Sequence, residues 1–88
     1  MKRDFVPRLA PKVRLKHDRH ANQWMLLYPE RGQVLDARAA EIAERCDGKH
    51  SIAEIADELA RAHGAPRDEI ESDVAEFVDE LAAKGLLA

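Results

Sequence analysis

The chain has 88 residues, 45% of them apolar, which suits one globular domain with a modest core. Its single cysteine, Cys46, excludes an internal disulfide and is typical of a protein kept in a reducing compartment. The longest apolar run, residues 24–28, is too short to cross a bilayer, and the N-terminus lacks the apolar segment of a secretion signal. We therefore expect a cytoplasmic protein without a membrane partner.

Charge is divided unevenly along the chain. Residues 1–31 carry eight Lys or Arg against three Asp or Glu, a balance of +5, whereas residues 32–88 carry six against fourteen, a balance of −8. The net charge of −3 is therefore the sum of a basic N-terminal part and an acidic C-terminal part. Each half has to be considered separately when partners are inferred.

Three extended segments are expected in the first half. Residues 1–11 contain two prolines and no clear period, which predicts an irregular arm and a candidate mobile segment. Residues 12–17 alternate apolar and basic side chains, as in a strand with one buried face. Residues 23–28 are apolar on both faces, which indicates a central strand. After a turn at residues 29–32, residues 33–35 make a short antiparallel strand at the edge.

Three helices are expected in the second half, each opened by a capping or first-turn residue and closed by a glycine. Their limits are Asp36 to Gly48, Ser51 to Gly64 and Pro66 to Gly85. In each helix, apolar residues at a spacing of three and four form a stripe along one face. The stripe of the second helix is expected to extend to His63. The pattern predicts an α+β fold that resembles a winged helix-turn-helix, with a three-stranded antiparallel sheet followed by three helices.

No constellation of side chains indicates catalysis. The histidines and the cysteine lack the paired near spacing of a structural zinc site. Cys46 lies at the negative end of its helix, which disfavours a thiolate, and it suits a small buried residue better than a nucleophile. The isolated glycines form no phosphate-binding loop. We therefore predict that the protein is not an enzyme and has no catalytic, metal-binding or cofactor-binding residues.

A winged-helix DNA-binding protein is the main alternative, because three helices with a small sheet are typical of that class. A recognition helix has to approach phosphates and therefore needs cations. The third predicted helix, residues 66–84, carries seven acidic residues against Arg67 and Lys84. The fold permits DNA binding whereas the charge argues against it, so we expect no nucleic-acid partner.

The short third strand raises the question of what its free edge does. Proteins usually protect such edges with lysine, proline or a bulge, and residues 33–35 include no charge and no proline. An unprotected edge beside an amphipathic helix can accept an extended peptide as an added strand. The alternative is that the third helix or the N-terminal arm covers the edge.

Five short motifs are spread over the chain between Pro11 and Leu87. They are Trp24-Met25-Leu26-Leu27-Tyr28-Pro29-Glu30-Arg31-Gly32, Leu35, Cys46-Asp47-Gly48, Ser51-Ile52-x-x-Ile55 and Asp73-Val74-x-x-Phe77-Val78-x-x-Leu81. Together they resemble the PqqD family. The specific part of the match is the combination of Pro-Glu after an aromatic strand with Asp-Gly before a capped helix.

The resemblance implies a winged-helix-like peptide chaperone used in the biosynthesis of pyrroloquinoline quinone (PQQ). Members bind a short ribosomal precursor peptide, PqqA, and present it to PqqE, a radical S-adenosylmethionine (SAM) enzyme. Related recognition domains serve other ribosomally made and modified peptides (RiPPs). On this basis, residues 12–88 are expected to form one peptide-recognition domain that binds its precursor by strand addition, as a monomer or as a weak or strand-swapped dimer.

Carried onto this sequence, the family's groove lies between the third strand and the third helix. The peptide-binding residues that it implies are Gln33, Val34 and Leu35 on the strand and Ile70, Asp73, Val74 and Phe77 on the helix. Two of them have an alternative role, since Val74 and Phe77 lie on the apolar stripe and would also suit the core. The enzyme's docking face is not located by the sequence, and the basic arm with the first strand is one candidate for an acidic partner.

Overall fold

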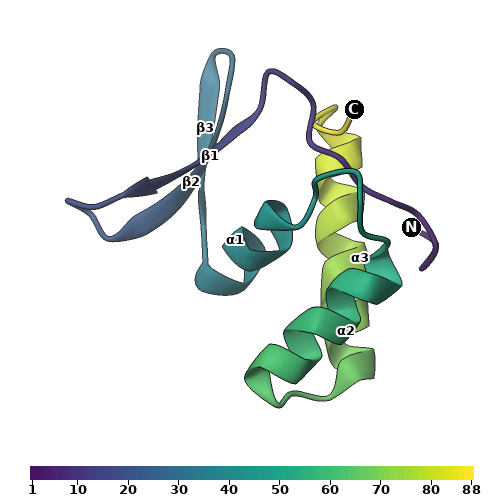
Figure 1. The fold of residues 1–88 in the computed structure, drawn as a ribbon. Coiled ribbons are helices and arrows are strands. Elements are labelled where there is room, and N and C mark those ends of the chain that lie inside the picture. The colour runs from purple at the N-terminus through teal and green to yellow at the C-terminus, as the bar shows by residue number, and fades with distance from the viewer.

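The computed structural model describes residues 1–88 and has three strands followed by three helices (Figure 1). In chain order the elements are β1 (Arg14–Asp18), β2 (Gln23–Tyr28), β3 (Arg31–Leu35), α1 (Ala37–Glu44), α2 (Ile52–His63) and α3 (Arg67–Ala83). This order confirms the predicted α+β fold.

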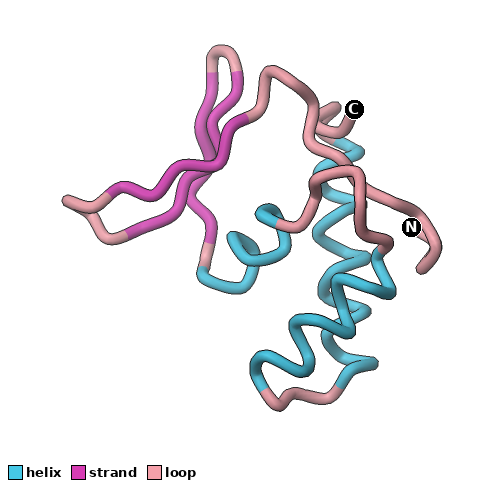
Figure 2. The backbone as a smooth tube through the Cα atoms, viewed as in Figure 1, coloured by secondary structure: helices cyan, strands magenta, loops and turns pink.

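β2 is the central strand of an antiparallel sheet ordered β1-β2-β3, as predicted. Directly opposed residues lie on the same face of a sheet, so the pairing of Leu26 with Leu15 and Gln33 defines an inner face. Leu26 is completely buried there, whereas Met25 on the outer face is only partly buried. Figure 2 shows the helices gathered to one side of the strands.

The turn between β2 and β3 is shorter than the predicted residues 29–32. Only Pro29 and Glu30 form it, and a φ of 73° at Glu30 after a proline is the geometry of a type II turn. Gly32 lies within β3, where an added Cβ would come within 3.1 Å of Leu27 Cδ2. The predicted extent of the turn is therefore wrong, because Gly32 is a strand residue in close contact with Leu27 on the outer face and not part of the turn.

Side-chain caps set the starts of α1 and α2. Asp36 Oδ1 accepts a hydrogen bond of 2.7 Å from the Ala39 N–H, which confirms the predicted N-cap of α1. Ser51 and Glu54 form the complete capping box predicted for α2, and Gly64 ends that helix with a φ of 60°. These local signals act within a few residues and are therefore readable from the sequence.

Two predicted details of the helices are wrong. α1 ends at Glu44, before Asp47-Gly48, because the chain leaves the helix at its C-cap and only later takes the left-handed conformation, at Gly48. His63 does not extend the buried stripe of α2. It lies in the last turn, where it is exposed, and its Nε2 is 2.7 Å from Glu41 Oε2.

The core joins the helices to the inner face of the sheet. α2 packs against α3, while α1 lies between α3 and the strands (Figure 1). The fully buried large side chains of the helices are Ile42, Ile52, Ile55, Leu59, Ile70, Val74, Val78 and Leu81. None of the three helices is both long enough and apolar enough to cross a membrane.

Residues 1–13 form no helix or strand apart from isolated bridges. Their backbone is nevertheless held in place, since the Leu9 N–H donates to Cys46 O at 3.1 Å and Pro7 is fully buried. In Figure 1 this purple segment runs across the helices and past the C-terminus. The N-terminal arm is thus irregular but packed, and it does not cover β3.

Candidate functional site

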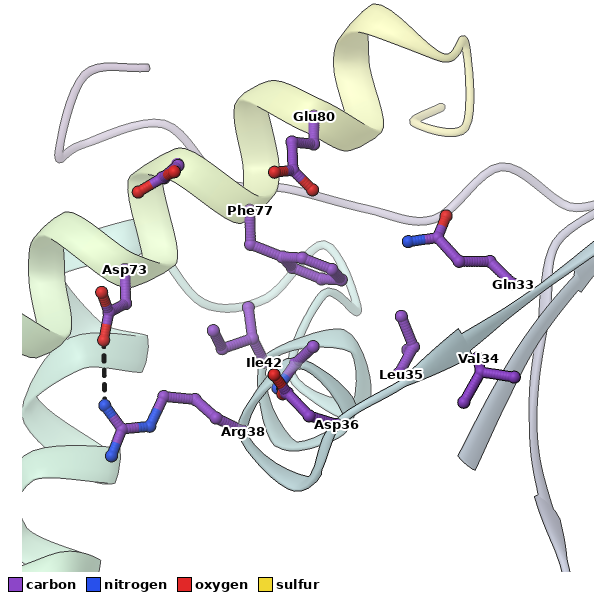
Figure 3. A pocket seen from close by; sticks show the side chains of 11 residues that line it. Gln33, Val34, Leu35, Asp36, Arg38, Ile42, Asp73, Phe77 and Glu80 are labelled. Atoms are coloured by element: carbon purple, nitrogen blue, oxygen red, sulfur yellow. Dashed lines mark hydrogen bonds and ion pairs between the residues drawn. The ribbon is translucent and has the colours of Figure 1, made fainter. Parts of the chain in front are cut away.

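A groove of about 380 Å³ opens between β3, α1 and α3 (Figure 3). Eleven residues line it: Gln33, Val34, Leu35, Asp36, Arg38, Ala39, Ile42, Asp73, Glu76, Phe77 and Glu80. Three separate elements therefore contribute to one surface depression.

β3 presents an unpaired backbone edge beside this groove. The pair Tyr28–Arg31 closes a two-residue turn, so it exchanges both of its backbone hydrogen bonds across the hairpin. Such pairs alternate with non-bonded pairs, so Gly32 and Val34 direct their N–H and C=O groups away from β2. No backbone hydrogen bond of a turn, loop or cap uses these groups. Four backbone groups are therefore available to an added strand.

The floor of the groove is apolar. Leu35, Ile42 and Phe77 converge on it from β3, α1 and α3 respectively (Figure 3), and their exposed fractions are only 5%, 2% and 8%. Val34 differs from these residues, because its side chain is 57% exposed and points away from Phe77. An extended segment lying beside β3 would direct every second side chain towards this floor.

Charged contacts cross the groove at both ends. Arg38 Nη1 lies 2.9 Å from Asp73 Oδ2 and links α1 to α3, as the dashed line in Figure 3 marks. Lys84 Nζ donates to Gln33 Oε1 at 2.8 Å and links α3 to β3. The remaining acidic residues of the lining, Asp36, Glu76 and Glu80, form no ion pair. The groove is therefore electronegative along its α3 wall.

Five of the seven expected site residues line the groove. They are Gln33, Val34, Leu35, Asp73 and Phe77. Ile70 and Val74 do not reach it, because their exposed fractions are 1% and 0% and they lie in the core. The reason is the helical period: the α3 row that faces the groove holds residues 73, 76, 77 and 80, and Ile70 and Val74 lie on the neighbouring buried row.

The groove residues that the sequence did not indicate come mostly from α1. Asp36 and Ile42 were recognisable as a cap and a stripe residue, and Arg38 as a polar position of the same helix. Nothing in their spacing shows that α1 closes one side of a groove, since this depends on how the helix is placed against α3. Glu76 and Glu80 were recognisable only as part of an acidic helix.

Cys46, the only thiol, is a core residue outside the groove lining. Burial, with a smaller contribution from the charge of Asp47, raises the pKa of its thiol to about 12. The thiol donates to Ile42 O at 3.3 Å. No three His, Cys, Asp or Glu side chains lie together in a way that would hold a metal ion. The groove thus offers backbone hydrogen bonds, apolar contacts and charge, which are the components of a binding site.

Residues 23–87 match the sequence model of the family described as "Coenzyme PQQ synthesis protein D (PqqD)". The chain belongs to the PqqD family. A curated relative from Xanthomonas campestris pv. campestris (strain B100), named "PqqA binding protein", is 49% identical over 85 residues. That alignment covers 97% of this chain and 92% of the relative. The family predicted from the motifs is therefore confirmed.

Two solved structures similar to this PqqD-family chain extend the comparison. The solution structure of the PqqD part of Methylobacterium extorquens PqqCD, described as a functional and stand-alone RiPP recognition element, has a TM-score of 0.87 at 34% identity. It aligns with 99% of this chain, and 93% of its own chain is covered. A lasso peptide synthetase B1 complexed with its leader peptide has a TM-score of 0.79 at 26% identity, covering 96% of this chain and 99% of that one. The fold is thus shared with peptide-binding recognition elements.

Proposed function

We propose that this PqqD-family protein is a non-catalytic chaperone of PQQ synthesis that binds a PqqA-type precursor peptide as a fourth strand beside β3. The observation that carries the proposal is the unpaired backbone edge at Gly32 and Val34, next to a groove with an apolar floor. The name of the curated relative supports PqqA as the kind of peptide. The leader-peptide complex of the lasso peptide synthetase supports a leader segment as the part that is bound.

Backbone bonds and groove contacts have different roles in this complex. The N–H and C=O groups of Gly32 and Val34 would form hydrogen bonds that each contribute about 0.5–1.5 kcal/mol net. Such bonds depend little on the sequence of the peptide and therefore give general affinity. Alternate side chains of the peptide would contact Leu35, Ile42 and Phe77, where buried apolar area contributes roughly 25 cal/mol per Å². These contacts would set the register and select the peptide.

The proposal includes presentation of the bound peptide to a radical SAM enzyme of the PqqE type. Strand addition engages only the few peptide residues that lie along β3, from Arg31 to Leu35. The rest of the peptide stays free to enter the active site of a partner. A carrier of this kind needs no catalytic group of its own.

Amide-shift titration of the ¹⁵N-labelled protein with a PqqA-type peptide tests the proposal. We expect the largest shifts in β3 and at the groove-facing residues of α3, and the smallest in α2. The Val34 amide should become protected from hydrogen exchange only in the complex, because it gains a hydrogen-bond acceptor there. A scrambled peptide of the same composition serves as the control. Shifts confined to α2 or the N-terminal arm, or an unprotected Val34 amide at saturation, would contradict strand addition.

A further inference from the structure

The outer face of the sheet is the side turned away from the helices, and it meets the groove only at Val34. The register places three rows of residues on this face: Lys16, Met25 and Val34 form one, Arg14, Leu27 and Gly32 form the second, and Asp18 with Gln23 forms the third. The helices lie on the opposite, inner side, where Leu26 is buried. We use the term outer face for these eight residues.

The centre of the outer face is apolar. An added Cβ on Gly32 would lie 3.1 Å from Leu27 Cδ2 and 3.5 Å from Met25 Cε, so these two side chains lie across the glycine. Val34, beside them, has the most exposed large apolar side chain of the protein, at 57%. A hollow of about 510 Å³ adjoins Met25 and Leu27 at the β1–β2 loop. An apolar centre next to a hollow is typical of a protein interface.

Cations flank this apolar centre along β1 and the β1–β2 loop, and they form no ion pair within the protein. Arg14, Lys16 and Arg19 take part in none of the ion pairs. In the helical half, Arg38, Arg45 and Arg67 are each paired with a carboxylate, whereas Lys49 and Arg61 are not. The acidic side chain of the hollow, Asp18, accepts hydrogen bonds from the backbone N–H groups of the following loop. A surface of this kind complements an acidic protein patch.

We propose that the outer face is the docking surface for the enzyme that modifies the bound peptide, and that this enzyme contributes an acidic patch around an apolar spot. This inference rests on the proposed function. A peptide strand added to β3 would continue the row of Lys16, Met25 and Val34, because opposed residues share a face. Its side chains would alternate between the groove and the outer face. The enzyme would therefore contact the carrier and the peptide on one continuous surface.

Charge reversal on β1 tests this docking surface. In the double variant Arg14→Glu/Lys16→Glu, two exposed residues of β1 change sign, and neither of them lines the groove. The matched control, Lys49→Glu/Arg61→Glu, makes the same change of charge outside the sheet. Binding of each protein to a PqqE-type radical SAM enzyme is measured by biolayer interferometry at low and high salt, with and without a PqqA-type peptide. Peptide affinity is measured separately, and amide spectra check the fold.

We expect the β1 variant to bind the enzyme at least about tenfold more weakly, with a reduced salt dependence, and to keep its peptide affinity within about twofold. The control should retain both. The milder variant Arg14→Gln/Lys16→Gln should show an intermediate loss.

Three results would overturn the docking surface. The first is unchanged enzyme binding by the β1 variant. The second is a loss of peptide and enzyme together in a folded variant, since the effect would then act through the groove. The third is salt-sensitive binding of random duplex DNA that depends on Arg14 and Lys16, with enzyme binding unaffected. Failure of the wild-type protein to bind peptide would instead refute the proposed function. In that case, enzyme binding measured without peptide would still test whether the outer face is the docking surface.

Discussion

The two edge strands of the sheet, β1 and β3, both have unpaired backbone groups, but they differ in the side chains and helices beside those groups. Hydrogen-bonded and non-bonded pairs alternate along both pairs of strands. On β3 this leaves the backbone groups of Gly32 and Val34 pointing away from β2, and on β1 it does the same for Leu15 and His17. β1 has charged side chains at three of its five positions, which is a common protection of an edge, whereas β3 has none from Gly32 onwards. The groove opens beside β3 alone.

This difference shows that an open edge is insufficient to define a peptide site. Both edges offer donors and acceptors, so the backbone alone does not choose between them. The choice comes from α1 and α3, which place an apolar floor next to β3, and from the absence of charge along that strand. In the proposed complex, a peptide strand would therefore gain both backbone bonds and side-chain burial at this edge alone.

The largest effect on peptide affinity is expected from a proline that removes one backbone N–H donor from the edge of β3 and leaves the edge of β1 unchanged. Val34→Pro deletes an N–H that faces the groove, and an edge position tolerates the residue because no β2 bond is lost. We expect peptide affinity to fall by more than about tenfold, which corresponds to roughly 1.4 kcal/mol. Fluorescence titration with a labelled PqqA-type peptide measures it.

His17→Pro is the matched control for this variant, since it deletes an outward N–H on β1. It should leave peptide affinity unchanged. Equal losses in the two variants would show that the β1 edge also binds peptide. No loss in either would remove strand addition from the mechanism.

A second comparison separates the groove from the core beneath it. Phe77→Leu and Ile70→Val each remove apolar volume from α3, and each is expected to lower the free energy of unfolding by about 1 kcal/mol. Only Phe77 lines the groove, so only Phe77→Leu should weaken peptide binding, by roughly three- to tenfold. Urea unfolding and peptide titration on both variants measure the two quantities. Weaker binding in Ile70→Val would mean that the groove reaches deeper than the structure shows.

A third variant tests the junction that joins β3 to the groove. Asp36 follows β3 directly and caps α1 through its 2.7 Å bond to the Ala39 N–H. Asp36→Ala should lower the free energy of unfolding by about 1 kcal/mol. Asp36→Asn keeps an acceptor and should lose much less. Amide exchange in the first turn of α1 reports the change, and protection that is unaltered in Asp36→Ala would show that the cap is not needed.

The smallest effect concerns α2, away from both edges. Hydrogen bonds to Glu54, first from the Ser51 N–H at 2.9 Å and then from the Ser51 hydroxyl, lower the pKa of its carboxyl. Since the folded pKa is depressed, this stabilisation is present above the pKa of an unfolded glutamate, about 4.3, and is lost as the pH falls below that value and through the folded pKa. In Glu54→Gln, stability should depend less on pH across that window, as measured by urea unfolding. An identical pH dependence in both proteins would contradict the assignment.

Local signals in the sequence were sufficient for the elements of this fold. The capping residues Asp36 and Ser51 act over a few positions and predicted the starts of α1 and α2 correctly. The alternation over residues 12–17 predicted a strand correctly, although β1 begins two residues later, at Arg14. The errors arose where a residue has more than one structural use. Gly32 suited a turn, yet it lies in β3 in close contact with Leu27.

The candidate site was predictable only in part. The uncharged edge pointed to the strand as one possible site, and the resemblance to the PqqD family then indicated Gln33, Val34 and Leu35 as its residues. On α3 the sequence offered two overlapping rows, and only packing shows that Phe77 reaches the groove while Val74 does not. The α1 side, with Arg38 and Ile42, had no signal at all in the spacing.

The sequence by itself determined the order of strands and helices, the caps, and the separation of a basic N-terminal part from an acidic C-terminal part, because short-range hydrogen bonding and hydrophobic period establish these within a few residues. The tertiary structure alone decided that the edge of β3 stays open and that α1 and α3 form a groove beside it. The physical reason is that a groove is made by segments distant in sequence, whose packing determines which side chains line the groove and which lie in the core.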